Sequence, residues 1–436
     1  ATEAKSGKSA VSLGVMEMLL RKIEKVGFFR PIIAGGSGGS VEEKDADIDL
    51  LTSYYNLDLP YEETYGYTAE EANRLISSGK EEELIEGIIS RYDKLKDRYD
   101  FVLCEGTDLA SSTAAFEFDI NGELSKNLGS PVLLVANAYK KTNDETIRSI
   151  DLALDSLNEK GCRVIGIIVN RPEREKAEEI LATMDERGLY KDLLVYAVPD
   201  EEFLGKPTVR EVAAFTNAEV LYGEDQLNRH VYNFTVAAMQ LRNFLTRIDH
   251  GSLIITPGDR SDIIMSCLAM ASSKSAEAIS GLFLTGGLRP EKPVWDLVRS
   301  FPKMVPILLV QGNTFPSAML VSQVHSKIAP HDATKISKAL ALFDEHVDAD
   351  ELSEQVITLK TGVVTPKMFE YELLQRAKKD RQHIILPEGK EERILQATDI
   401  LLKREVADIT LLGNEEHIRE NIARLGLEMD GVGIID

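Results

Sequence analysis

Short apolar runs alternate with stretches of helical periodicity along most of this chain. In the first half, the apolar runs occupy residues 26–33, 99–106, 131–138, 162–170 and 192–199. Val, Ile and Leu stand at consecutive positions of these runs, which is typical of strands buried on both faces of a parallel sheet. Between them, segments such as 82–99 and 143–161 place apolar residues at helical spacing. The pattern predicts an α/β fold, a parallel sheet with helices on both faces.

The same alternation continues on a smaller scale in the second half. Residues 251–271, 279–287 and 305–315 indicate strands followed by loops and helices. A charged stretch of helical spacing follows at 331–360, and residues 381–414 indicate a strand, a loop, a helix and a strand. We therefore expect a large first domain (1–210), a smaller α/β domain (211–330), a helical connector (331–364) and a truncated α/β segment (365–436).

Composition and charge narrow the class of protein. A chain of 436 residues is too long for one ordinary core, and a prior of about 150 residues per domain suggests about three domains. The formal net charge of −22 argues against broad binding to nucleic acids or membranes, so any anionic ligand needs a local pocket. No apolar run approaches the roughly 20 residues of a membrane span. Cys104, Cys162 and Cys267 stand singly in apolar runs, which indicates a reduced, cytoplasmic protein.

The first fourteen residues, ATEAKSGKSAVSLG, contain a candidate phosphate-binding loop. Gly7, Lys8 and Ser9 form GKS at the entrance to a helical run. In such a loop, backbone amides and the helix N-terminus meet phosphate oxygens, the lysine adds charge, and the hydroxyl ligates Mg²⁺. Thr2 stands where GxxxxGK[ST] requires its first glycine, and no strand precedes the loop within the sequence. A nucleotide site and a chance GKS therefore both stay open.

Two features indicate that the chain differs from a complete natural protein. GGSGGS at 35–40 has the composition of an inserted flexible linker, with a native loop as the alternative. The sequence starts without Met and stops in GVGIID, so we expect a fragment or a trimmed chain.

Polar residues stand near the ends of the predicted strands of the first domain. Asp45 and Asp47 follow one strand, Glu105 closes another and Asn170 ends a third, while Arg30 lies within the run at 26–33. Ligands of open α/β sheets bind at the carboxyl ends of the strands, where carboxylates can hold Mg²⁺ and an amide can read a purine edge. The alternative is that each residue caps the helix that follows. The predicted nucleotide site comprises Gly7, Lys8, Ser9, Arg30, Asp45, Glu105 and Asn170, with Ser9, Asp45 and Glu105 around the Mg²⁺.

A second candidate pocket lies in the smaller α/β domain. The motif GDRSDII (258–264) follows a predicted strand, and LTGG (284–287) ends the next one. Asp259, Arg260, Gly286 and Gly287 can line a regulatory pocket, or they can fix turns and pack a dimer interface. Neither motif holds a nucleophile beside a base, so no catalytic unit is visible.

These motifs carry family resemblances. GKS at 7–9, RPI at 30–32, DA at 45–46, EG at 105–106 and Asn170 resemble the dethiobiotin synthetase branch of the P-loop fold. The second pair of motifs resembles the DRTGG domain. ILPEG (385–389), EERIL (391–395) and ADITLLGN (407–414) resemble the beginning of the phosphate acetyl/butyryl transferase domain. In this order the three resemble long-form bacterial phosphate acetyltransferase, which implies a P-loop-type sheet, a DRTGG domain and a truncated transferase segment.

The resemblance implies an acyltransferase of acetate metabolism. The family moves acetyl reversibly between coenzyme A and inorganic phosphate, and its acetyl phosphate is made without a required cofactor. Acetyl-CoA, CoA and phosphate are then the partners of the full-length enzyme, which we expect to be a homo-oligomer. The catalytic groups are expected beyond Asp436, so this chain is mainly a regulatory and assembly portion, inactive alone. Arg393 is either a CoA or phosphate contact or a solvated helix cation.

Two alternatives from other classes stay open. The chain can be a regulatory module without catalysis, with ATP/Mg²⁺ or NADH as the effector. It can also be an ATP-dependent ligase that resembles dethiobiotin synthetase. Arg30 in place of a lysine and the missing first glycine of the loop count against the ligase.

Overall fold

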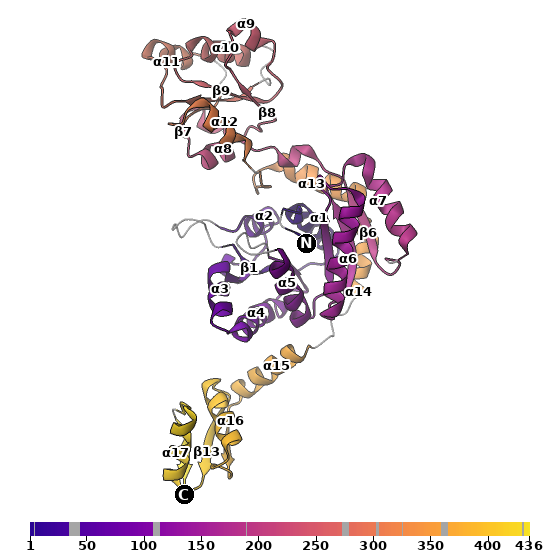
Figure 1. The fold of residues 1–436 in the computed structure, drawn as a ribbon, viewed down its shortest axis with the longest axis vertical. Coiled ribbons are helices and arrows are strands. Elements are labelled where there is room, and N and C mark those ends of the chain that lie inside the picture. Colours follow the sequence, from indigo (N-terminus) through magenta and orange to yellow (C-terminus); the bar gives the residue numbers. More distant parts are fainter. Residues whose placement is uncertain are drawn as a thin grey trace.

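The computed structural model folds the chain into three α/β parts, and the first part lies between the second and the third in space (Figure 1). It describes residues 1–3, 5–34, 44–107, 114–188, 190–272, 279–301, 305–324, 326–358, 365–429 and 431–436, without the side chains of 114–117. The GGSGGS segment at 35–40 lies outside the described residues, so both interpretations of it stay open.

The first domain, residues 1–205, contains two three-stranded parallel sheets, ordered β2-β1-β3 and β4-β5-β6. Its strands are β1 (Val26–Ile33), β2 (Tyr65–Thr68), β3 (Phe101–Cys104), β4 (Val132–Asn137), β5 (Val164–Asn170) and β6 (Leu194–Val198). All five strands predicted here are present. The sixth, β2, was missed because its sequence, YGYT, lacks a run of Val, Ile or Leu.

Helices surround these strands, which confirms the predicted class. They are α1 (Lys8–Leu20), α2 (Ala46–Tyr54), η1 (Tyr61–Glu63), α3 (Ala69–Ser77), α4 (Glu81–Lys96), α5 (Ala114–Leu128), α6 (Asn143–Glu159), α7 (Arg174–Arg187) and η2 (Glu202–Gly205). Thr68 and Thr142 begin α3 and α6 with complete capping boxes. By contrast, α1 begins at Gly7 without a side-chain cap. The first amides of α1 therefore have no side-chain acceptor from the capping residue.

The predicted connector packs into the core of the first domain. It forms α13 (Ala333–His346) and α14 (Ala349–Thr358). Phe343 and Leu352 are buried in the same apolar cluster as Leu13 of α1 and Phe28 of β1. A β-carbon on Gly14 of α1 would lie 2.2 Å from the ring of Phe343, so the two helices touch where α1 has no side chain. The connector thus forms one wall of the first domain (Figure 1).

The second domain is one five-stranded sheet in the order β7-β11-β10-β9-β8. Its strands are β7 (Glu219–Tyr222), β8 (Asn233–Val236), β9 (Ser252–Pro257), β10 (Ile279–Thr285) and β11 (Ile307–Leu309). Its helices are α8 (Val209–Thr216), η3 (Glu224–Gln226), α9 (Leu241–Leu245), α10 (Ser261–Ser272), α11 (Lys292–Val298) and α12 (Thr314–Ser322). Among the strands that the structure describes in this domain, β7 alone runs antiparallel to its neighbour, and apolar clusters form on both sides of the sheet.

The third domain is a small parallel sheet that follows a long helix. Its elements are α15 (Pro366–Lys379), β12 (Gln382–Leu386), α16 (Glu392–Lys403), β13 (Ala407–Leu412), α17 (Glu415–Leu425) and β14 (Gly433–Ile435), with the strand order β12-β13-β14. The strand, helix and strand expected within 381–414 are therefore present.

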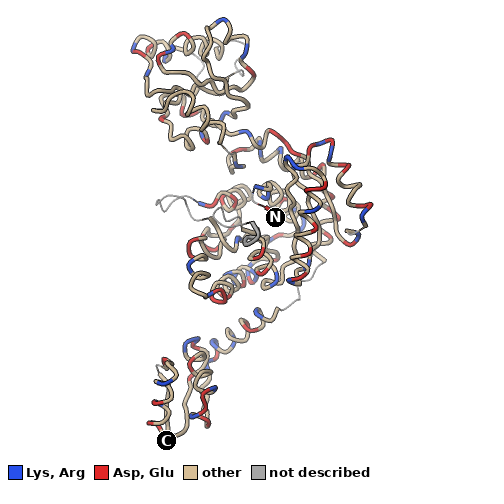
Figure 2. Tube along the Cα trace, in the orientation of Figure 1, with Lys and Arg blue, Asp and Glu red and all other residues tan. Residues whose placement is uncertain are grey.

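Positions of Lys and Arg are interspersed with positions of Asp and Glu along the backbone trace of all three domains (Figure 2). None of the described helices combines the length and apolar character needed to cross a bilayer.

Candidate functional site

The candidate phosphate loop is held by Asn170, at the end of β5. Gly7 has φ +80°, in the left-handed region that favours glycine. The Nδ2 of Asn170 donates to the carbonyl oxygen of Ser6 at 2.7 Å, and a β-carbon on Gly7 would lie 2.4 Å from that nitrogen. Glycine is therefore required both by the backbone and by the close approach of Asn170.

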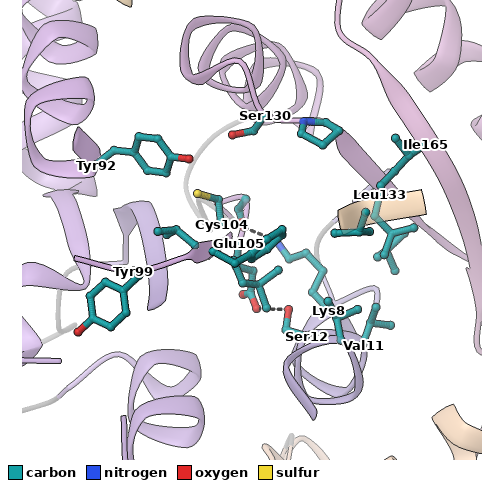
Figure 3. A pocket seen from close by; sticks show the side chains of 18 of the residues that line it. Lys8, Val11, Ser12, Tyr92, Tyr99, Cys104, Glu105, Ser130, Leu133 and Ile165 are labelled. Atoms are coloured by element: carbon teal, nitrogen blue, oxygen red, sulfur yellow. Dashed lines mark hydrogen bonds between the residues drawn. The ribbon is translucent and has the colours of Figure 1, made fainter. Parts of the chain in front are cut away.

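Lys8 and Ser9, in the first turn of α1, connect the loop to the ends of two other segments. The Nζ of Lys8 donates to the carbonyl oxygen of Gly106, beyond β3, at 2.8 Å. Ser9 donates its hydroxyl to Asp47 in the first turn of α2. One turn further along α1, Ser12 donates to Oε2 of Glu105 at 2.6 Å (Figure 3). The structure thus brings together residues that the sequence places up to a hundred positions apart.

Three carboxylates of this site surround Arg30, whose exposed fraction is 5%. Its Nη1 lies 2.7 Å from both carboxylate oxygens of Asp45 and 3.1 Å from Asp47, and its Nη2 lies 3.5 Å from Glu105. Burial opposes the charge of the guanidinium, but the carboxylates, Glu105 foremost, outweigh it and raise the pKa of Arg30. Asp45 also caps α2, since it accepts from the amides of Asp47 and Ile48. Asp45 therefore caps the helix that follows it, as the alternative interpretation expected, and it also forms an ion pair with Arg30.

Glu105 is a buried carboxyl group whose pKa is shifted strongly. Burial and then the charge of Asp47 raise its pKa to about 7, against the opposing effects of Arg30 and Lys8. Its Oε1 is buried without a hydrogen-bond partner, although Arg30 lies 3.5 Å away. A carboxyl with such a pKa carries its proton for much of the time near neutral pH.

The described residues do not offer Mg²⁺ a shared open position. Among them, no group of three or more His, Cys, Asp or Glu side chains has the arrangement of a metal site. Asp45 and Glu105 turn toward Arg30, and Ser9 turns toward Asp47. The assignment of Ser9, Asp45 and Glu105 to Mg²⁺ stays a prediction, and in this arrangement the three side chains contact Arg30 and Asp47.

A cavity of about 350 Å³ opens over the N-terminus of α1. One wall is the loop itself with Lys8 and Ser9, and other walls include Lys327, which precedes the connector, and Phe343 of the connector helix α13. The remaining sides include Asp47, Asn170, Arg171, Asp200 and Glu201. Four of the seven predicted nucleotide-binding residues, Gly7, Lys8, Ser9 and Asn170, thus line one cavity. Glu105 lines a neighbouring cavity, and Arg30 and Asp45 contact Glu105 and Asp47 without lining either one.

Two cations that line this cavity, Arg171 and Lys327, were not predicted as site residues from the sequence. Arg171 forms an ion pair with Asp200 at 2.7 Å, and its guanidinium lies 4.0 Å from the ring centre of Tyr139. Its position immediately after the strand-end Asn170 was a usable signal. Lys327 carried no signal, because it lies in the segment between α12 and α13 and reaches the cavity only in the folded chain.

In the second domain, the predicted pocket residues lie on two neighbouring turns. The turns follow the parallel strands β9 and β10, and the amide of Gly258 donates to Thr285 at 3.3 Å. Arg260 pairs with Asp262 at 2.8 Å instead of facing Gly286, and this pair is partly exposed. Gly286 and Gly287 have φ +81° and +66°, and their amides bind the carbonyls of Gly312 and Val310. Asp259, Arg260 and the two glycines therefore share an edge of the sheet, and the turn-fixing alternative accounts for the glycines.

Arg393 lies in the first turn of α16 and is exposed. It belongs to the third domain, apart from the other predicted site residues. Its role as a CoA or phosphate contact stays a prediction.

A glycine turn that enters a helix with Lys and Ser, at the carboxyl ends of parallel strands, defines the first domain as a P-loop domain. Comparison with known families agrees: the AAA domain family matches residues 1–224, and the chain belongs to it. The DRTGG domain matches residues 211–324, and the phosphate acetyl/butaryl transferase domain matches residues 368–436. The three matches confirm the family order that the motifs indicated.

Relatives are similar over the whole chain. The phosphate acetyltransferase of Nitratidesulfovibrio vulgaris is 46% identical over 100% of this chain and 62% of its own length. The phosphate acetyltransferase of Synechocystis sp. is 35% identical over 98% of this chain and 61% of its own. That of Pseudomonas aeruginosa is 27% identical over 99% and 62%. The chain thus spans about three fifths of the length of these relatives.

Proposed function

We propose that the chain is the N-terminal portion of a phosphate acetyltransferase, which transfers acetyl reversibly between acetyl-CoA and inorganic phosphate. The order of the three domain matches and the 46% identity to one relative of that name support this proposal. The chain as given is the regulatory and assembly portion, because only residues 368–436 match the transferase domain and Arg393 there is exposed. CoA, acetyl-CoA and phosphate are the partners of the whole enzyme.

The first test of this proposal measures acetyl transfer. The chain as given should release no CoA from acetyl-CoA and phosphate, whereas a chain completed to the length of its relatives should produce acetyl phosphate. Absence of activity in the completed, folded chain would contradict the assignment.

Within that enzyme, the first domain binds a nucleotide as an effector. The observation that carries this part is the 350 Å³ cavity over the uncapped N-terminus of α1, with Lys8, Ser9, Arg171 and Lys327 in its walls. Backbone amides at a helix N-terminus and nearby cations favour phosphate groups. The overall charge of −22 makes such a local arrangement necessary for any anionic ligand.

Calorimetry with ATP, ADP and NADH, each with and without Mg²⁺, tests the nucleotide site. Lys8→Ala should weaken binding by about tenfold or more, since a charged contact to phosphate is worth about 1.5–3 kcal/mol. Lys176→Ala, on the exposed side of α7 where Lys176 pairs with Glu173, is the control and should bind as the wild type does. If no nucleotide binds, or if Lys8→Ala leaves the affinity unchanged, the site has been assigned wrongly.

The same samples address the ligase alternative, because a ligase would release ADP from ATP in the presence of its substrate. We expect no ADP release, since Arg30 stands at the position of the family's lysine and is held by three carboxylates.

We also propose a cytoplasmic homo-oligomer. The three cysteines are free, which fits a reducing compartment. On α12 of the second domain, Phe315, Met319 and Leu320 are exposed by 76%, 49% and 45%, and exposed apolar side chains of this kind suit a subunit contact. Light scattering on the wild type and on Phe315→Asp measures this: the variant should have the smaller mass.

A further inference from the structure

The chain crosses between the first and the second domain at two places. The first crossing, residues 206–208, leads from η2 into α8, and the second crossing, residues 326–332, precedes α13. Glu211, which follows the first crossing, accepts at 3.0 Å from the amide of Lys327 in the second. The two crossings therefore lie side by side and are joined by a side chain of the second domain.

The second crossing contributes to two cavities. On one side, Ser326, Lys327 and Ile328 line the 350 Å³ cavity over the N-terminus of α1. On the other side, Lys327 also lines a cavity of about 260 Å³, together with Glu211 and His230 of the second domain. Ile328 is buried in the apolar cluster of the first domain. This crossing is thus a wall of the proposed nucleotide site and a border of the second domain at once.

A buried lysine of α13 holds the second crossing. Lys335 has an exposed fraction of 0%, and its Nζ donates to the hydroxyl of Ser326. Ser326 in turn donates to Oε1 of Glu211 at 3.0 Å, so one hydroxyl connects the ammonium to a carboxylate of the second domain. Burial lowers the pKa of Lys335, and the charges of Glu211 and Asp332 oppose this shift. A buried ammonium is costly unless carboxylates compensate it in this way.

Glu211 has two roles, and they need different chemistry. It is the third residue of α8, where its Oε2 accepts from the amide of Thr208 at 2.7 Å and completes a capping box. A capping box needs an acceptor at this position, which glutamine provides as well as glutamate. The ammonium of Lys335, by contrast, needs a negative charge nearby. The charge of Glu211 is therefore required by α13 of the connector and not by the cap of α8.

Asp332 forms a second tie between the two domains. Its Oδ1 accepts from the amide of Lys335 at 3.1 Å and caps α13, while its Oδ2 lies 2.8 Å from Nε2 of His230. His230 is itself paired with Thr208 of the first crossing in an antiparallel bridge. Further along α13, Phe343 lines the cavity over α1. One helix thus carries both ties to the second domain and a wall of the nucleotide site.

We propose that Lys335, Ser326 and Glu211 form an interdomain latch. Lys335 and Glu211 are positioning residues, and they hold Lys327 in the wall of the nucleotide cavity. A phosphate group that contacts Lys327 orders the second crossing, and the ordered crossing in turn stabilises the start of α8 through Glu211. This coupling between the domains rests on the proposed function, whereas the latch itself requires no ligand.

Hydrogen exchange measured by mass spectrometry without nucleotide tests the latch. Lys335→Met removes the charge at similar volume, and Glu211→Gln keeps an acceptor for the cap. In both variants a peptide that covers 326–332 should exchange about tenfold faster than in the wild type, because a charge-assisted contact is lost. Glu145→Gln, in the capping box of α6, is the matched control and should leave this peptide unchanged. Unchanged exchange of the peptide in Glu211→Gln would overturn the latch.

The place of the effect separates a latch from a general loss of stability. Peptides that cover β1 and β9, in the cores of the two domains, should exchange in both variants as they do in the wild type. A uniform increase in both cores would mean that Lys335 only stabilises the fold, and the latch would be wrong. Glu211 is partly exposed, so Glu211→Gln decides this question even where Lys335→Met does not fold.

The same exchange measurement with ATP, ADP and NADH in turn, each at saturating concentration, tests the coupling. In the wild type, nucleotide should slow the exchange of a peptide that covers α8 by about threefold or more. In Glu211→Gln, nucleotide should still bind, with an affinity lower by about threefold, but the protection of α8 should be lost. Peptides that cover β12 and β13 in the third domain are the internal control. Equal protection of α8 in the two proteins would overturn the coupling.

Failure of the proposed function is distinguishable from failure of this inference. If none of the three nucleotides protects α1 in the wild type, the nucleotide function and the coupling are both wrong, and the measurement without nucleotide decides the latch. If a nucleotide protects α1 but not α8 in the wild type, the nucleotide function stands and the coupling is wrong.

Discussion

The candidate sites of the first and second domains both lie at the carboxyl ends of parallel strands, but they differ in how their charges are satisfied. In the first domain, Arg30 is 5% exposed and meets carboxylates from two other segments. In the second domain, Arg260 pairs with Asp262, two residues away, at the surface. The ion pairs of Arg30 require the tertiary fold, whereas the ion pair of Arg260 forms within one turn of the chain. Arg260 also donates to the carbonyls of Ala237 and Met239, but these contacts are neutral and partly exposed.

This difference has energetic consequences. A buried ion pair is costly to break, because the partner left behind stays buried and charged, whereas a surface pair contributes little. Loss of the ion pairs of the first site should therefore lower the free energy of unfolding of the first domain. Loss of the ion pair of the second site should hardly change that of the second domain. The single Trp295 lies in the second domain, so its fluorescence reports on that domain while hydrogen exchange of β1 reports on the first.

The largest effect is expected for Arg30→Ala. Removing the guanidinium leaves the buried carboxylates of Asp45 and Glu105 without their cation, at a cost of about 3–5 kcal/mol to the first domain. Exchange of the β1 amides should speed up accordingly, with Trp295 fluorescence unchanged. Arg260→Ala is the matched variant of the second domain and should cost less than about 1 kcal/mol. If the two variants lost the same free energy of unfolding, the proposed difference between a buried and a surface ion pair would be wrong.

The next largest effect is expected where the connector covers the first domain. Phe343 is 3% exposed and contacts α1 at Gly14, so Phe343→Ala should destabilise the first domain by about 3 kcal/mol or more. Denaturant midpoints followed by exchange of the β1 amides measure this. Leu152→Ala, at a residue of the first domain that is 66% exposed on α6, should change stability by less than about 0.5 kcal/mol. A small effect at Phe343 would mean that the connector is dispensable for the core.

A pH effect of intermediate size is expected from Glu105. Its pKa is raised from an ordinary 4.5 to about 7 by burial, so the folded state binds a proton that the unfolded state has lost between these values. Stability contributed by this group therefore falls as pH rises from 4.5 to 7. Glu105→Gln carries no charge to desolvate, and should gain stability relative to the wild type between pH 5 and pH 8, on the order of 2 kcal/mol. A constant difference between the two proteins across this range would contradict the raised pKa.

The smallest effect separates backbone strain from contact with Asn170. Gly7→Ala and Gly79→Ala both place a side chain at positive φ, which costs roughly 1–2 kcal/mol in each case. Only at Gly7 does the new β-carbon meet a neighbour, Asn170, since the space around Gly79 is open. Gly7→Ala should therefore also weaken nucleotide binding in calorimetry, and Gly79→Ala should leave it unchanged. Equal affinities in the two variants would argue against the loop as the binding site.

Much of the fold was accessible from local patterns. The Val- and Ile-rich runs at 26–33 and 162–170 became β1 and β5, because a strand covered on both faces must be apolar throughout. Among the strands that were not predicted, YGYT of β2 and NFTV of β8 are short and half polar, and pairing with neighbouring strands is what makes them strands. The intrinsic β-propensity of a residue predicts a strand poorly where pairing with neighbouring strands supplies most of its stability.

The site was accessible in part. Gly7, Lys8 and Ser9 adjoin one another in sequence, and Asn170 and Glu105 end strands, so strand-end chemistry indicated them. Which of them touch could not be read from the sequence: Ser9 reaches Asp47, not Asp45, and Ser12 reaches Glu105. Lys327 lines the cavity although it stands in the segment between α12 and α13, where no local sequence pattern indicated a binding residue.

The sequence by itself determined the α/β alternation, the order of the three families and the residues that a phosphate loop needs, because periodicity and motif spacing are local properties of the chain. Only the tertiary structure decided that three carboxylates converge on Arg30 and that the connector covers the core of the first domain. It also decided that the edge strands β3 and β4 of two sheets line one cavity. These features depend on contacts between segments far apart in the chain, where burial and hydrogen-bond satisfaction, not local preference, set the free energy.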